Sequence, residues 1–129
     1  MKPKEQLKEK AERFHQFLQS KFSKEPNDII DRIELLGILI SESGECLADA
    51  KYYRDKLING EIMNALKAGY ASQLTPSALN KFIASLAYEE NLLVNMLDRI
   101  NASATHQLDG LRSILSYRKT EFSSLNYTK

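Results

Sequence analysis

Cysteine, glycine and proline are scarce in this sequence, and tryptophan is absent. The 129 residues include one cysteine, five glycines and three prolines. The lone Cys46 excludes an internal disulfide, and no apolar segment of the kind found in secretory signals follows the charged N-terminus. We therefore expect a cytoplasmic protein in a reducing compartment. So few glycines and prolines leave little material for turns, which favours a small number of long helices.

Long apolar runs and the common catalytic motifs are also missing. No apolar stretch approaches the roughly 20 residues that cross a bilayer, so we expect no membrane span. The sequence has neither a glycine-rich phosphate-binding loop nor zinc-type cysteine and histidine spacings. Glu12 and His15 form one Glu-x-x-His pattern, whereas a di-iron bundle needs two. We expect no catalytic residue, no metal site and no cofactor, and we expect that the protein is not an enzyme.

The apolar residues that are present recur at helical spacing, most clearly between Pro76 and Phe122. The steps between them are mostly three and four, which predicts one continuous helix with a core-facing stripe. Thr75 can cap the first turn, and proline is well tolerated at the first helical position. At about 1.5 Å per residue this helix would be about 70 Å long. Its stripe comprises Leu79, Ile83, Leu86, Leu93, Leu97, Ile100, Ala104, Leu111 and Ile114.

Two further helices are predicted before it. Lys4 to Phe22 is amphipathic, and Pro26 breaks the helical pattern after it. The second helix begins near Asp28 and continues through Gly60, at a cost of about 1 kcal/mol, to about Ala71. Its predicted core stripe is Ile29, Ile33, Leu36, Ile40, Ser43, Leu47, Ala50 and Leu57.

These elements predict an all-α fold. A short turn over Ser72 to Thr75 would join the two long helices into an antiparallel hairpin. The N-terminal helix is long enough to cover only the near half of this hairpin, residues 28–48 and 100–122. We expect one helical domain over residues 1–122 and a frayed tail over 123–129.

The hairpin also predicts which residues lie side by side. A turn centred near residue 73 places Arg99 near Glu45 and Arg112 near Glu34. Ser43 and Gly44 would lie near Ala102 to Ala104, where small residues allow the helices to approach closely. Glu90 falls on the core-facing side of the last helix and needs a basic partner, for which this register offers Arg54 or Lys56.

The far half of the hairpin carries more apolar residues than two helices can bury. Monomers rarely expose contiguous apolar patches beyond a few hundred Å². We therefore predict that this end associates with another copy, most simply as a dimer that completes a bundle with two-fold symmetry. The predicted interface consists of Tyr53, Leu57, Ile62, Met63, Leu66, Tyr70, Phe82 and Met96.

Positive charge is concentrated near the two ends of the chain. Residues 1–25 hold seven basic and four acidic side chains, and residues 112–129 hold four basic and one acidic. Because the first helix folds back over the hairpin, we expect both segments to lie at one end of the molecule, where their basic side chains could bind the phosphates of a nucleic acid. The candidate contacts are Lys8, Lys10, Arg118 and Lys119. Glutamates alternate with the lysines of the first helix, which is equally typical of a solvent-exposed helix face.

Two segments resemble a group of small all-helical accessory proteins encoded by tailed bacteriophages and by prophages of gut bacteria. One segment runs from His106 to Glu121 and is preceded by Asp98-Arg99-Ile100-Asn101, and the other runs from Gly44 to Arg54. The resemblance covers about half of the chain. It implies a cytoplasmic accessory protein in a phage context, and it implies no catalytic residue.

The functional hypothesis is a non-catalytic accessory or adaptor protein that acts through helix-mediated self-association and protein–protein contacts. The alternative is a nucleic-acid-binding factor in replication or recombination that uses the basic residues.

Overall fold

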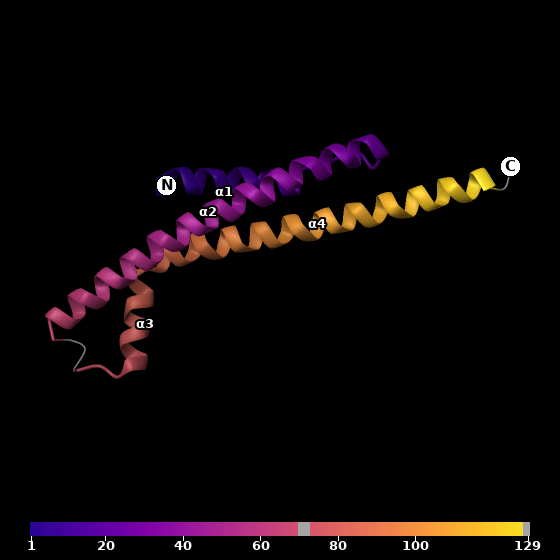
Figure 1. The fold of residues 1–129 in the computed structure, drawn as a ribbon. Helices are drawn as coiled ribbons and strands as arrows, with labels where there is room; N and C mark the ends of the chain where they lie inside the picture. Colours follow the sequence, from indigo (N-terminus) through magenta and orange to yellow (C-terminus); the bar gives the residue numbers. More distant parts are fainter. Residues whose placement is uncertain (70–72, 128–129) are drawn as a thin grey trace.

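The protein is all-helical, with two long antiparallel helices as its stem. The structure is a computed structural model and describes residues 1–69 and 73–127, with side chains as far as Phe122. Within these residues it contains four helices and no strand: α1 (Lys4–Gln19), α2 (Pro26–Lys67), α3 (Pro76–Leu86) and α4 (Tyr88–Tyr127). Figure 1 shows α2 and α4 lying along each other, α1 packed on this stem, and α3 turned sharply away from α4 at one end. We call that end, formed by α3 and the last turns of α2, the tip.

The prediction of one continuous helix from Pro76 to Phe122 is wrong, because the helix breaks at Ala87. Ala87 has φ −96° and ψ 23°, outside regular helical geometry. Its N–H still donates to Ile83 O (3.2 Å), and its carbonyl accepts from the N–H of Asn91 (2.9 Å). The Thr75 cap is confirmed, since its hydroxyl accepts from the N–H of Ala78 at 3.1 Å. Ala87 is fully buried, and alanine favours helices. The bend therefore results from packing and not from a helix-breaking residue.

The second helix continues through Gly60 as predicted and starts two residues early, at Pro26. It ends at Lys67, before the predicted end at Ala71. The next residues explain this end: Gly69 has a φ of 75°, and its N–H donates to Leu66 O at 3.2 Å. A left-handed glycine after the last turn is a common helix terminator. The turn predicted over Ser72 to Thr75 lies partly outside the described residues, which resume at Gln73.

The outer helices also differ from their predicted bounds. The first helix ends at Gln19 rather than Phe22, because Ser20 adopts an extended backbone and its side chain bonds to Phe17 O. The last helix continues past Phe122 to Tyr127, over residues predicted to be a frayed tail. No glycine or proline follows Gly110 in the sequence, so nothing in its backbone chemistry ends the helix at Phe122.

The core lies where α1, α2 and α4 meet. On α2 the buried face is rotated by one position from the predicted stripe: Leu39 and Cys46 are buried, whereas Ile40 and Leu47 are only partly buried. The rotation follows from α1, which packs on the Cys46 side of α2 and brings Lys10 to Glu42. The core cluster comprises Leu7, Ala11, Phe14, Ile29, Leu36, Leu39, Cys46, Ala50, Leu93, Val94, Leu97, Ile100, Ala104, Leu108 and Leu111.

The register of the stem is close to the predicted one. The amide of Asn101 donates to Ile40 O and to Ser43 Oγ, both at 2.9 Å, so Ser43 lies beside Asn101. Gly44 lies on the same level, since a Cβ there would be 3.8 Å from the Asn101 amide nitrogen. The predicted ion pairs of Arg99 with Glu45 and of Arg112 with Glu34 are not formed among the described residues. No helix in the described part of the chain is both long and apolar enough to cross a membrane.

Two glycines, one inside α2 and one just after its last turn, test where this helix continues and where it ends. Gly60 lies in a helix interior with open space around the position of a Cβ, so Gly60→Ala should stabilise the protein by about 1 kcal/mol. Gly69 also faces open space but has a positive φ, so Gly69→Ala should destabilise it by about 1 kcal/mol. Urea unfolding of both variants measures the two changes. A stabilising Gly69→Ala would contradict the described end of α2.

Candidate functional site

A buried arginine holds α1 to the stem. Arg32 of α2 is only 5% exposed, and none of the ion pairs among the described residues involves it. Its guanidinium donates to Phe17 O (2.7 Å), to Ser20 Oγ (2.8 Å) and to Gln107 Oε1 (2.9 Å). It also stacks on the Phe17 ring, at 3.9 Å from the ring centroid. Arg32 of α2 therefore joins α1 to both helices of the stem.

These bonds place positive charge at the C-terminal end of α1. The last carbonyls of a helix lack intrahelical partners and carry partial negative charge. Arg32 binds Phe17 O, and the Gln107 amide donates to Leu18 O at 3.3 Å. Burial lowers the pKa of the Arg32 guanidinium, but an arginine remains charged at neutral pH. The sequence contained an indication of this role that was not used: Arg32 follows Ile29 by three residues and precedes Leu36 by four, which places it on the buried face of α2.

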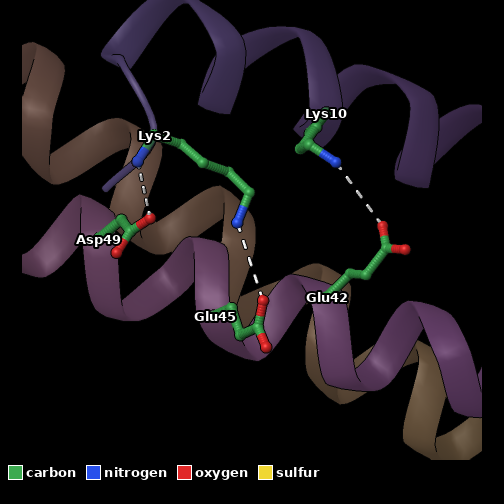
Figure 2. Close-up of polar contacts among 5 residues, drawn as sticks. All are labelled: Lys2, Lys10, Glu42, Glu45 and Asp49. Atoms are coloured by element: carbon green, nitrogen blue, oxygen red, sulfur yellow. Dashed lines mark hydrogen bonds and ion pairs between the residues drawn. The ribbon is translucent and has the colours of Figure 1, made fainter.

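Lysines fix the other end of α1 to acidic side chains. Figure 2 shows Lys2 and Lys10 reaching α2, where the Lys2 ammonium lies 3.8 Å from Glu45 and the Lys10 ammonium 3.8 Å from Glu42. The backbone N–H of Lys2 donates to Asp49 Oδ2 at 3.2 Å (Figure 2). The hydroxyl of Tyr53 donates to Lys2 O at 2.9 Å. The start of α1 therefore lies beside the middle of α2.

Glu90 is paired with α1 rather than with α2. Lys4 Nζ lies 2.9 Å from Glu90 Oε1, and the Glu90 side chain is 12% exposed. The predicted partner Arg54 bonds instead to its neighbour Asp55. Burial raises the pKa of Glu90, but the hydrogen bond and charge of Lys4 act against it, and the net effect lowers this pKa. The pair stabilises the start of α4 against α1, a structural role.

The four predicted nucleic-acid contacts do not lie together. Lys10 pairs with Glu42, and Lys8 lies 3.6 Å from Glu5. Asn101 of α4 lies beside Ser43, and therefore at the level of Glu42, the partner of Lys10. Arg118 lies about 25 Å further along α4 than Asn101. Lys119 is exposed near the same end of α4. Lys8 and Lys10 thus pair with acidic side chains and lie far from Arg118 and Lys119.

Groups with chemical reactivity are isolated in the described part of the chain. No cluster of three or more metal-ligating side chains is found there, and Glu12 and His15 are both exposed. Cys46 is fully buried, and this burial raises the pKa of its thiol. A buried thiol of high pKa is a poor nucleophile.

The tip contains an apolar cleft. It has a volume of about 570 Å³ and lies between the end of α2 and α3. At the break at Ala87, α3 turns away from the line of α4 (Figure 1), and Leu86 beside this break lines the cleft. Three large apolar side chains of its lining remain exposed, Leu74 at 40%, Phe82 at 52% and Leu86 at 45%, and Met63 (54%) and Leu66 (55%) are exposed on α2 outside the lining. The lining residues are Glu61, Asn64, Ala65, Ala68, Leu74, Leu79, Phe82 and Leu86.

The structure divides the predicted interface residues into two groups. Tyr53 and Met96 pack against the core cluster, and Leu57 and Ile62 are half-buried. Met63, Leu66 and Phe82 are exposed at the tip. Tyr70 lies outside the described residues. The difference arises because α1 begins beside Tyr53, further towards the tip than predicted, and covers part of the surface expected to be bare.

Comparison with known proteins adds no relative. The chain matches no protein-family model, no curated protein and no solved structure. The arrangement of its own side chains therefore carries the functional argument, and the apolar cleft at the tip is the candidate site. A cleft of this volume and lining can hold apolar side chains of a protein partner.

The Arg32 junction predicts a large loss of stability on truncation. Arg32→Ala removes three hydrogen bonds of a buried guanidinium and its stacking on the Phe17 ring, so we expect destabilisation by about 2–4 kcal/mol. The control is Arg99→Ala, which removes an exposed arginine of α4 and should change stability by less than about 0.5 kcal/mol. Urea unfolding measures both. Equal effects of the two variants would contradict the anchoring role of Arg32.

The Lys4–Glu90 pair predicts a pH dependence. Because the folded-state pKa of Glu90 is lowered, its contribution is present above the unfolded-state pKa of about 4.3 and is lost as the pH falls through the lower folded-state value. Glu90→Gln should therefore destabilise the protein at pH 7 and have a smaller effect at pH 3. Glu89→Gln, in the same first turn but exposed, is the control for the helix dipole. Urea midpoints at the two pH values decide the outcome, and an effect of Glu90→Gln that does not change with pH would contradict the pairing.

Proposed function

We propose that the protein is a non-catalytic accessory or adaptor protein that works through self-association and protein–protein contacts at the tip. The observation that carries the proposal is the apolar cleft between α2 and α3, with exposed Phe82 and Leu86 in its lining and exposed Met63 and Leu66 elsewhere on the tip. Apolar side chains that gather around a concave site are typical of a protein interaction surface. The proposal includes the phage or prophage context that the resemblance of residues 106–121 implies.

The position of α1 supports the tip as the interacting part of the molecule. The 16 residues of α1 span about 24 Å, whereas the 42 residues of α2 span about 63 Å. Arg32 holds one end of α1, and Lys4 with Glu90 holds the other. Since α1 is fixed over the middle of the stem, its apolar residues cannot cover the tip. The apolar surface there is available to a second copy.

Matched substitutions test this proposal. Met63→Glu and Phe82→Glu place a charge at the tip and should each convert a dimer into a monomer, because an unpaired charge is costly inside an apolar interface. Ile38→Glu is the control: Ile38 is 56% exposed, close to the 54% of Met63, but lies on the stem. Sedimentation velocity at several concentrations measures the association. A wild-type protein that sediments as a monomer at high concentration, or an Ile38→Glu variant that alone dissociates, would contradict it.

A further inference from the structure

We propose that the tip is an isologous interface with a second copy of this chain, in which the Phe82 ring of each copy enters the other copy's cleft. Lys81 of each copy then pairs with Glu61 of the other. The inference rests on the proposed self-association and adds to it a specific arrangement and a charge pair that selects the partner.

The shape of the tip supports a self-complementary contact. A two-fold interface uses the same surface on both copies, so one surface must supply both a projection and a recess. The tip has both: the cleft of about 570 Å³ lies between α3 and the end of α2, and Phe82, one of its lining residues on α3, is still 52% exposed and so available to a second copy. The lining of the cleft is largely aliphatic, with Ala65, Leu79 and Leu86 among its residues. An aromatic side chain is a suitable occupant, because it buries a large apolar area at a small cost in side-chain entropy.

The charges around the cleft complement each other in the same arrangement. Glu61 lines the cleft on α2, and Lys81 precedes Phe82 on the exposed side of α3. Neither forms an ion pair with any residue in the described part of the chain. When Phe82 enters a second cleft, the neighbouring Lys81 approaches the Glu61 of that cleft. By symmetry the contact occurs twice in one dimer, so its contribution to the binding free energy is counted twice. Partners of the wrong charge are disfavoured for the same reason.

The break at Ala87 keeps this surface available. No glycine or proline lies between Ser77 and Asp109, and alanine has the highest helix propensity. The sequence pattern predicts that α3 continues α4 as one straight helix. In that form α3 would lie along α2 and the cleft would be closed. A second copy that occupies the cleft would favour the bent form, because occupancy is a binding free energy available only to that form.

Charge reversal tests the arrangement in the full-length protein. Glu61→Lys and Lys81→Glu each place like charges opposite one another at both contacts, so each should raise the dimer dissociation constant about tenfold or more. An equimolar mixture of the two variants restores opposite charges at both contacts. We therefore expect a heterodimer of near wild-type affinity, measured by sedimentation equilibrium and by native mass spectrometry. Heterodimer formation also proves that both variants are folded.

The outcomes separate this inference from the proposed function. If the wild-type protein dimerises but the single reversals dimerise equally well, or the mixture forms no preferential heterodimer, the Phe82 and Lys81 arrangement is wrong and self-association stands. If the wild-type protein is monomeric at all concentrations, both are wrong. As a matched control, Glu34→Lys and Lys51→Glu reverse two exposed charges of α2 on the stem that form no ion pair among the described residues, and they should produce neither effect.

Discussion

The placement of α1 on the stem determines which surfaces of this protein are covered. A helix of 16 residues lies on a pair of helices of 42 and 40 residues, so most of the stem's length must lie outside its reach. Arg32 fixes the C-terminal end of α1 through the carbonyl oxygen of Phe17, and Lys4 fixes the start of α1 to Glu90. Buried polar groups of this kind contribute more to specificity of position than to net stability. The apolar core between the helices provides most of the stabilisation.

The two ends of the stem consequently differ. At the tip, α3 turns away from α4 at Ala87, and an apolar cleft lies between α3 and the end of α2. At the opposite end, α4 continues beyond the start of α2 (Figure 1). Lysines of the N-terminal segment pair with acidic side chains of α2, where Lys2 lies near Glu45 and Lys10 near Glu42. This pairing reduces the free positive charge of the N-terminal segment, which is why the tip, and not a basic surface, is the candidate site.

Much of the fold could be predicted from the spacing of apolar residues, because helical periodicity extends over long segments of the chain. The continuation of α2 through Gly60 agrees with that pattern, and Ser43 lies beside Asn101, one position before the predicted Ala102 to Ala104. The break at Ala87 could not be predicted, since the local sequence favours a helix and only tertiary packing opposes it. Arg32 was missed because a charge on a core stripe suggests an exposed position until its partners on other helices are known.

The most direct test of a shared tip is hydrogen–deuterium exchange measured on dilute and on concentrated protein. Amides in an interface exchange more slowly when association covers them and suppresses local opening. The account predicts that the last turns of α2, from about Glu61, and all of α3 exchange more slowly at high concentration, while α1 and the middle of α4 do not change. Exchange that is independent of concentration at the tip, or that slows only along the stem, would contradict it.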